Sequence, residues 1–333
     1  MDKVLVTGGN GHLGYNLIKL LVDKGYKVRT SVRDKADFKK VGHLQSLNVD
    51  IIEMDLMKPE TMYPAVKGVD GVFHVASPFK IISKKPEEEV IDPIVNGYLN
   101  ILKASKDEGV KKFILTSSVV AIGTVCSGEN PLTEETWNKK PVNPYSKAKT
   151  RAEKIAWDFS NENNLNMVAI LPTTIIGPYF HRHTPSTILF ERLLKGELPF
   201  ILPFTFNFVD VRDVAKIHLS AYEDKNAKGR YIVSNKTLSL SELFQIVHSI
   251  YPNIKIPGRK LSNNLLYVAP LFDYIYSVFT GKERLLSLDL IKEYANKIQS
   301  YSNEKIVKEF NFSPIPIEET IKDTIEWMVN ANK

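Results

Sequence analysis

The chain has 333 residues and carries 44 Lys and Arg against 38 Asp and Glu, a formal charge of +6 at pH 7, and 43% of its residues are hydrophobic. This composition is typical of a globular protein with a sizeable core and excludes a disordered or fibrous chain. The lysines are scattered among acids, so the charge indicates a solvated surface and predicts no nucleic-acid partner. The single cysteine, Cys126, excludes a disulfide framework and a cysteine-based metal site, and it favours a cytoplasmic location.

No stretch of about 18 uncharged apolar residues occurs, so we expect no stable membrane insertion. The nearest candidate, Leu265 to Phe279, is interrupted by Pro270 and Asp273, and a packed helix explains it best. Contact of this segment with a membrane or a partner stays open. The apolar run after Met1 is too short for the core of a signal peptide.

The first 175 residues alternate short β-branched runs with longer amphipathic stretches, the pattern of a parallel sheet covered by helices on both faces. We expect strands at Lys3–Thr7, Tyr26–Val32, Val49–Glu53, Gly71–Val75, Lys112–Thr116 and Asn166–Leu171. Helices are expected between them at Leu13–Lys24, Asp37–Leu47, Glu60–Val66, Glu87–Glu108 and Pro144–Asn163. After Pro172 the regularity fails as far as about Asn207. A strand at Arg230–Ser234 then rejoins the sheet, and the last hundred residues read as mainly helical, ending with Ile317–Asn330.

The predicted fold class is therefore α/β. It is a doubly wound parallel sheet (Rossmann fold) with a smaller, mainly helical, discontinuous substrate domain. Residues 1–175 and 208–235 would form the nucleotide-binding domain, and residues 176–207 and 236–333 the substrate-binding domain, both of ordinary domain size.

A glycine-rich run follows the first strand directly and has the spacing Gly8-x-x-Gly11-x-x-Gly14. Glycines at this spacing allow a tight turn, close approach of the backbone to a pyrophosphate, and close packing of helix on strand. The helix that follows adds free N–H groups and a partial positive charge. The run predicts a dinucleotide site that uses Thr7, Gly8, Asn10, Gly11, His12, Leu13 and Gly14.

The end of the second strand indicates which nicotinamide cofactor binds. Arg33 comes first after the strand, and an arginine here accommodates the 2′-phosphate of NADP, whereas a carboxylate holds the 2′-hydroxyl of NAD. We therefore favour NADP(H), with Ser31 as a further donor. The alternatives are that Arg33 is only a surface charge, or that Asp34 holds the ribose of NAD. Asp55 and Leu56 are expected at the adenine edge, although helix capping explains Asp55 equally well.

Two features further along bear on catalysis. The fifth strand delivers Ser117 and Ser118 to the carboxyl edge of the sheet, where open α/β folds bind their ligands. Tyr145 and Lys149 lie at i and i+4 of an expected helix and therefore share one face. A phenol of pKa about 10 is a poor acid-base catalyst at pH 7, but an adjacent ammonium would lower that pKa toward neutrality. The same lysine can hydrogen-bond the nicotinamide ribose.

Together these motifs resemble one family. The chain is similar to the extended short-chain dehydrogenases/reductases, and within them to the dihydroflavonol reductase-like group and its bacterial relatives. The matching motifs stand in the family's order to about residue 235: Thr7–Gly14, Val28–Asp34, Val72–Pro78, Thr116–Ser118, Tyr145–Lys149 with Thr150, Ala152 and Glu153, Leu171–Thr173 with Gly177 and Pro178, Phe208–Val214, and Gly229–Tyr231.

The resemblance implies a catalytic set of Ser118, Tyr145 and Lys149. Ser118 would hold the substrate carbonyl oxygen, Tyr145 would protonate it, and NADPH would deliver hydride to the carbon. Asn96 matches an asparagine that completes a proton relay in many relatives, although a helix-packing amide explains it equally well. The family further implies that Val75, Ala76, Ser77 and Thr116 line the cofactor, that Pro172 and Thr173 touch the nicotinamide, and that the helices Glu87–Glu108 and Pro144–Asn163 form a homodimer interface in many relatives.

Other candidates have plainer explanations. The family spacing favours Ser118 over Ser117, and Lys147, at i+2, points away from the face of Tyr145. His181 and His183 lack a third ligand at suitable spacing, so we predict no metal site and expect a role in the pocket or at the surface.

The leading hypothesis is NADPH-dependent reduction of an aldehyde or ketone to an alcohol. An apolar or aromatic pocket suits a hydrophobic small-molecule carbonyl better than a diphosphosugar, and Val119 and Val120 stand where related dehydratases carry an acidic pair. Three alternatives stay open: an NAD-dependent nucleotide-sugar epimerase, a hydroxysteroid dehydrogenase-like enzyme, and a non-catalytic NADP-binding sensor. The expected substrate residues are Ser118, Pro78, Phe79, Ile122, Tyr179, Phe180 and Phe204.

Overall fold

A computed structural model describes residues 2–78 and 82–331. Its centre is a parallel sheet with the strand order β3-β2-β1-β4-β5-β6-β9. The order reverses between β1 and β4, which places the switch point of a doubly wound sheet at the carboxyl ends of these two strands. The strands are β1 (Lys3–Thr7), β2 (Lys27–Val32), β3 (Asp50–Glu53), β4 (Gly71–His74), β5 (Lys112–Thr116), β6 (Met167–Pro172) and β9 (Gly229–Val233).

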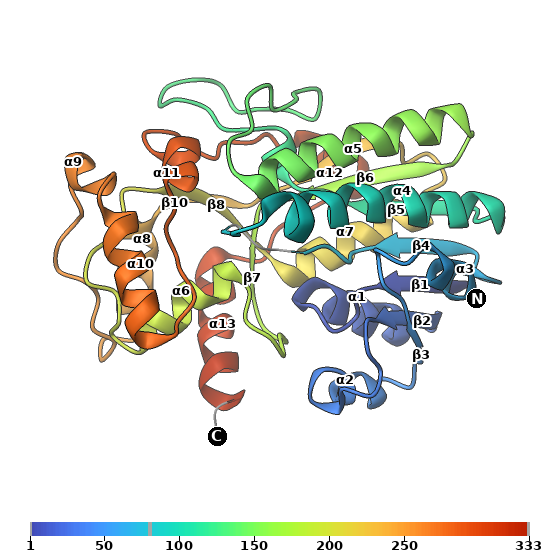
Figure 1. Ribbon diagram of the computed structural model, residues 1–333, viewed down its shortest axis with the longest axis horizontal. Helices are drawn as coiled ribbons and strands as arrows, with labels where there is room; N and C mark the ends of the chain where they lie inside the picture. The colour runs from blue at the N-terminus through green and yellow to red at the C-terminus, as the bar shows by residue number, and fades with distance from the viewer. Residues whose placement is uncertain (1, 79–81, 332–333) are drawn as a thin grey trace.

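Helices cover both faces of this sheet (Figure 1). Because successive side chains of a strand point to opposite faces, each face has its own apolar core. Val4 and Val6 of β1 join the core under α1 and α7, whereas Leu5 joins the core under α4 and α5. The helices of these layers are α1 (His12–Asp23), α2 (Phe38–Gln45), α3 (Met62–Val66), α4 (Asp92–Asp107), α5 (Pro144–Glu162) and α7 (Val211–Glu223).

The strands and helices predicted up to residue 172 are confirmed, mostly with bounds that differ by about one or two residues. One local difference lies in the expected helix Glu87–Glu108, which begins with a π-helical turn over Glu87–Ile91 before α4. Pro93 stands in the first turn of α4 and has no N–H to donate to Glu89. The missing donor gives a physical reason for the wider turn.

Beyond β6 the chain builds a second sheet, which the sequence analysis missed. Its strands are β7 (Thr174–Ile176), β8 (Thr205–Asp210) and β10 (Lys236–Ser239), in the order β10-β8-β7. These short strands come from distant segments, so no local periodicity marks them. A third core lies around them, formed with α6 (Pro185–Leu194), α8 (Leu240–Ile250), α11 (Leu288–Tyr294) and α13 (Ile317–Ala331).

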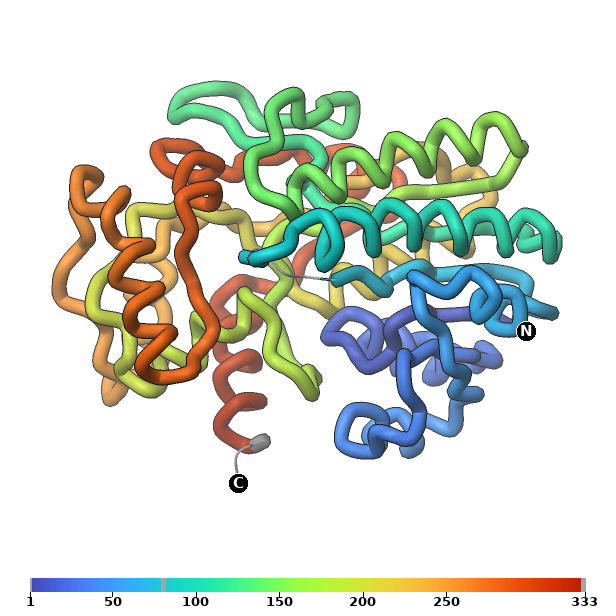
Figure 2. Tube along the Cα trace, in the orientation of Figure 1, coloured from blue at the N-terminus to red at the C-terminus, as the bar shows by residue number. Residues whose placement is uncertain are grey.

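Figure 2 shows this second part at the end of the molecule opposite the blue N-terminal strands. It also contains α9 (Asn263–Leu266) and α10 (Ala269–Thr280), whereas α12 (Glu304–Phe310) packs beside β9. Within the segment Leu265–Phe279 only Leu266 and Pro270 are buried, so the expectation of a packed helix is wrong for most of its apolar side chains. No helix in residues 2–78 and 82–331 is long and apolar enough to cross a membrane.

A buried carboxylate joins the C-terminal part to the start of α5. Oε2 of Glu293, on α11, accepts hydrogen bonds from the N–H groups of Val142 and Asn143, both at 2.8 Å. It also accepts from Nδ2 of Asn143 at 3.1 Å and from Oγ of Ser146 at 3.0 Å. A negative charge is favourable at this position because the helix N-terminus carries a partial positive charge. The position of α5 therefore depends on α11.

We expect Glu293→Gln to lower the free energy of unfolding by about 1–3 kcal/mol. A neutral amide loses the charge-assisted hydrogen bonds, and its NH₂ group would face the N–H and O–H donors that now surround the carboxylate. Urea unfolding of wild type and variant measures this difference. Glu162→Gln, at the exposed end of α5, is the matched control and should stay within about 0.5 kcal/mol of wild type. Equal stability of all three proteins would contradict the role of Glu293.

Candidate active site

The predicted dinucleotide turn lies at the carboxyl end of β1. Gly8 has a φ of +71°, and a Cβ there would come within 2.9 Å of Cα of Ala76. A Cβ at Gly14 would overlap the carbonyl oxygen of Gly8, so α1 packs directly on the turn. Gly11 is the N-cap of α1, and no described side chain caps that helix. The N–H groups of its first turn are therefore available to a phosphate.

Three side chains around this turn test whether a phosphorylated dinucleotide fits. Oγ of Ser77 is buried without a hydrogen-bond partner in the described chain, so a polar ligand atom would satisfy it. Arg33 is exposed just past β2 and forms no ion pair within residues 2–78 and 82–331. Asp34 accepts a hydrogen bond from the N–H of Ala36 at 2.8 Å, so its carboxylate closes a local turn. These residues fit a ribose phosphate better than a ribose hydroxyl.

The hydroxyl of Thr7 ties β1 to the segment after β4. Its Oγ1 accepts from the N–H groups of Val75 at 3.0 Å and Ala76 at 2.9 Å, so its own proton goes to Nδ1 of His74, 2.9 Å away. Burial lowers the pKa of His74 to about 3, and the ring is neutral with its proton on Nε2. Thr7 therefore fixes the backbone of Val75 and Ala76 beside the glycine turn.

The side chain of His12 is engaged away from the turn. Its Nε2 donates to the carbonyl oxygen of Pro178 at 3.0 Å, and its ring packs edge-on against Phe180 with centroids 5.2 Å apart. Burial lowers the pKa of His12 to about 4, which keeps the ring neutral. The His12 side chain therefore joins α1 to the loop after β7. Only the backbone N–H of His12, in the first turn of α1, remains for a phosphate. Asn10 is half-buried in the turn, and Leu13 packs in the core.

Ser118 and Tyr145 meet at the carboxyl edge of the sheet. Ser118 starts the short 3₁₀ turn Val119–Ala121, and its Oγ accepts from the N–H of Val120 at 3.3 Å. A hydrogen bond joins the Ser118 and Tyr145 side chains. Burial raises the pKa of Tyr145, while the hydrogen bond with Ser118 acts in the opposite direction. At neutral pH the phenol is therefore protonated.

Lys149 is buried between α4, α5 and the end of β5. Its Nζ donates to Oη of Tyr98 at 2.5 Å and to the carbonyl oxygen of Thr116 at 3.0 Å, and the Tyr98 hydroxyl donates to the same carbonyl at 2.8 Å. An ammonium has three donors, so one remains for the side of Tyr145, whose ring centroid lies 5.8 Å from Nζ. Burial lowers the pKa of Lys149 to about 7, while Glu153 acts in the opposite direction.

This geometry corrects one expectation. The sequence suggested that Lys149 lowers the pKa of Tyr145, but burial raises that pKa and the ammonium is directed at Tyr98 and Thr116. Asn96, the expected relay residue, is exposed on α4. Tyr98, two residues further along the same helix, contacts Lys149 instead. Sequence reasoning missed Tyr98 because its position in an amphipathic helix is explained by packing alone.

Ser117 has a different environment from Ser118. Its Oγ donates to Oε2 of Glu153 at 2.5 Å, and Nε of Arg230 donates to Oε1 of the same buried carboxylate at 2.7 Å. The Arg230 guanidinium also lies 3.9 Å from the ring centroid of Trp137. Ser117 therefore serves a buried ion pair, and Ser118 is the serine that faces Tyr145.

The remaining expected cofactor residues are occupied mainly by contacts within the chain. The Thr116 hydroxyl pairs with Nε2 of His218 at 2.8 Å, so only its carbonyl faces Lys149. Asp55 accepts from the N–H of Met57 at 3.0 Å, which closes a turn.

The backbone carbonyl of Ser31 accepts from the N–H of Gly8 at 3.1 Å. Leu56 packs against α4 at Gly97, Pro172 ends β6, and Thr173 bonds to the carbonyl of Val233.

The expected substrate residues separate into two groups. Ile122 is buried one turn after Ser118, and Pro78 is half-buried after β4, whereas Phe79 lies outside the described residues. The other three belong to different surroundings. Tyr179 packs against Trp327, Phe180 against His12, and Phe204 against Phe206, with no described contact to Ser118 or Tyr145.

The sequence analysis missed two aromatic residues, of which one lies near Tyr145 and the other packs against the first. Tyr294 of α11 is buried, which raises its pKa, and it lies near enough to Tyr145 that a charge on Tyr145 would raise that pKa further. Phe206 of β8 packs against Tyr294 with ring centroids 5.3 Å apart. Phe206 and Phe208 lie two residues apart on β8 and share one face, so strand alternation alone does not distinguish them.

The histidines after β7 pack against rings and acids. His181 stacks on His43 with centroids 3.9 Å apart and meets Tyr15 edge-on. His183 lies 3.8 Å from Glu191. Within the described ranges, no group of three or more His, Cys, Asp or Glu side chains is arranged to hold a metal ion.

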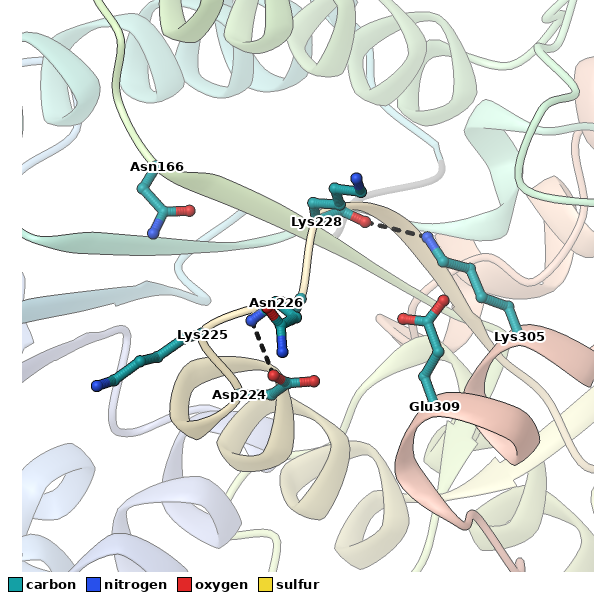
Figure 3. Close-up of a pocket in the computed structure, with 8 residues that line it drawn as sticks. Asn166, Asp224, Lys225, Asn226, Lys228, Lys305 and Glu309 are labelled. Carbon is teal, nitrogen blue, oxygen red and sulfur yellow. Dashed lines mark hydrogen bonds between the residues drawn. The ribbon is translucent and has the colours of Figure 1, made fainter.

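A cavity of about 590 Å³ lies at the opposite edge of the sheet (Figure 3). Asn166 and Lys228, which precede β6 and β9, line it together with Lys305 and Glu309 of α12. Nζ of Lys305 donates to the Lys228 carbonyl at 3.0 Å. This cavity is at the amino ends of the strands, and Ser118 follows the carboxyl end of β5, so the cavity is separate from Ser118, Tyr145 and Lys149.

Comparison with known proteins identifies the family of the chain. Residues 4–234 match the model of the NAD dependent epimerase/dehydratase family. A cinnamoyl-CoA reductase from Medicago truncatula is 34% identical over 340 aligned positions, which cover 98% of this chain and 95% of that protein. A dihydroflavonol 4-reductase from Arabidopsis thaliana is 34% identical, covering 77% of this chain and 72% of that protein.

Among solved structures, yeast methylglyoxal/isovaleraldehyde reductase in complex with NADPH superposes with a TM-score of 0.80. It is 25% identical and the match covers 99% of both chains. The resemblance to dihydroflavonol reductase-like, extended short-chain dehydrogenases/reductases is confirmed. The fold, the glycine turn and these matches lead to one conclusion: the chain belongs to the NAD dependent epimerase/dehydratase family.

Proposed function

We propose that this chain is an NADPH-dependent carbonyl reductase that converts an aldehyde or ketone with an apolar body to an alcohol. The observation that carries the proposal is the hydrogen-bonded pair of Ser118 and Tyr145, with Lys149 behind it, at the sheet edge that also holds the glycine turn. The reductases among the similar proteins support the reaction class.

The roles follow from the protonation states. Ser118 holds the carbonyl oxygen, and Oη of Tyr145 donates a proton to it. When bound, NADPH supplies the hydride to the carbonyl carbon. The alkoxide that then develops is a much stronger base than a phenolate, so a tyrosine with a raised pKa still protonates it. Lys149 directs one N–H toward the site, where it orients the ribose and stabilises the phenolate that remains.

The residues around the catalytic set favour a hydrophobic carbonyl compound. Ile122 and Tyr294 are buried, and Phe206 packs against Tyr294. Val119, directly after Ser118, is buried, so an acidic pair for elimination chemistry does not stand there. An apolar wall beside two hydroxyl donors is the usual composition of a pocket for a small apolar carbonyl.

Tyr145→Phe should lower kcat by at least about 100-fold, because the proton donor is lost, while the dissociation constant for NADPH changes little. NADPH oxidation with a panel of aldehydes, diketones and hydroxyketones measures the rate, and fluorescence titration measures binding. Tyr63→Phe, which removes an exposed hydroxyl bonded to Asp107, is the control and should keep full activity. Retention of most activity by Tyr145→Phe would refute the mechanism, and NADPH binding without turnover across the panel would favour a non-catalytic sensor.

Arg33→Ala should weaken NADPH binding by about 10–100-fold, the value of a charge-assisted contact with a phosphate, and leave NADH binding nearly unchanged. Calorimetric titration with each cofactor provides the comparison. Lys35→Ala removes a neighbouring exposed charge and controls for the general electrostatic field. An equal loss of NADPH and NADH affinity in Arg33→Ala would show that Arg33 does not bind the 2′-phosphate.

A further inference from the structure

Helix α10 presents an apolar stripe to solvent. We define the α10 stripe as Val268, Leu271, Phe272, Ile275, Val278 and Phe279. Phe272 is 66% exposed and Phe279 is 85% exposed, and the other members are also exposed. The spacing places all six within about one third of the helix circumference. A patch of this kind is uncommon on a soluble surface and marks a contact with another molecule.

The helix is held to the fold by its other face. On that face Pro270 is buried, and Asp273 and Ser277 are half-buried; Leu266 of the preceding α9 is also buried. The Asp273 carboxylate accepts hydrogen bonds from the N–H groups of Leu285 and Leu286, at 3.1–3.2 Å. A helix at a protein surface normally buries its apolar stripe and exposes its polar face. In α10 the arrangement is reversed, so the stripe serves an external contact.

Tyrosines of α10 flank the stripe, and cations precede α9 and follow α10. Lys255, Arg259 and Lys260 are exposed in the segment before α9, and Lys282 and Arg284 follow α10. Over the same residues, 255–284, the acids are Asp273, which faces inward, and Glu283. Nζ of Lys282 pairs with Glu197, and Nε of Arg284 lies 3.6 Å from Oδ2 of Asp273. The cations without an ion pair in the described residues are therefore Lys255, Arg259 and Lys260. Nζ of Lys282 lies 5.9 Å from the ring centroid of Tyr276, and the Arg284 guanidinium 5.5 Å from that of Tyr274. Apolar side chains flanked by tyrosines and cations are typical of a helix that lies in a membrane interface.

We propose that α10 docks on an anionic lipid surface, with the α10 stripe among the headgroups and acyl chain ends and the exposed cations Lys255, Arg259 and Lys260 near lipid phosphates. The charges favour this occupant over a second copy of the chain, because a symmetric contact would bring the cations of both copies together. The docking is peripheral and does not depend on the proposed reductase function.

Sedimentation of the full chain with lipid vesicles tests the proposal. We expect the protein to bind vesicles of phosphatidylcholine with about 30% phosphatidylglycerol at least about 10-fold more tightly than vesicles of phosphatidylcholine alone, and added salt to weaken the binding. Phe272→Ser with Phe279→Ser should reduce the affinity by at least about 10-fold, since two apolar anchors are lost. Phe38→Ser, at a 65% exposed position on α2, is the matched control and should bind like wild type.

A second variant separates charge from folding effects. Arg259→Gln with Lys260→Gln leaves the α10 stripe intact and should lower the affinity for anionic vesicles several-fold, with an unchanged circular dichroism melt. The proposal is overturned if wild type does not bind anionic vesicles. It is also overturned if ultracentrifugation shows a concentration-dependent dimer that the double serine variant abolishes, since a second copy would then cover the stripe.

Discussion

The site depends on a buried ammonium group. Lys149 is almost fully enclosed, and a charge in the interior is tolerated only when its donors have partners. Tyr98 of α4 and the carbonyl of Thr116 at the end of β5 supply two of them. Because Tyr98 also donates to that carbonyl, α4, α5 and β5 are held in one arrangement. That arrangement directs Tyr145 and Ser118 to the edge of the sheet where the glycine turn lies.

Residues distant in the sequence hold α5 at two further points. Glu153, one turn after Lys149, pairs with Arg230 of β9, and removing either partner would leave a buried charge alone. Glu293 of α11 fixes the first turn of α5. Helix α5 is thus anchored by the last strand of the large sheet and by the C-terminal part, so changes far from Tyr145 can alter its position.

Much of the large sheet could be predicted, because each strand and helix there has its own periodicity and the glycine turn has fixed steric requirements. Ser118, Tyr145 and Lys149 come from motifs with fixed spacing, and their catalytic roles stay a proposal. Tyr98 and Glu293 could not be found in this way, since their roles arise from contacts between distant segments. Phe180 and Phe204 stay predictions as pocket residues, because composition does not tell which core an aromatic side chain joins. The division into two domains at residues 175, 208 and 235 stays a prediction.

Titration of Lys149 by NMR of ¹³C-labelled lysine tests whether its ammonium is buried and hydrogen-bonded as this arrangement requires. The Lys149→Gln variant identifies the signal. We predict a pKa of about 7 without cofactor, caused by burial. This pKa lies below that of an unfolded lysine. The charge of Lys149 therefore destabilises the folded protein by its full amount below about pH 7, and this destabilisation falls as the pH rises. Tyr98→Phe should lower the pKa further, since it removes a hydrogen bond to the charged form. A pKa near 10.4, unchanged in Tyr98→Phe, would contradict the account.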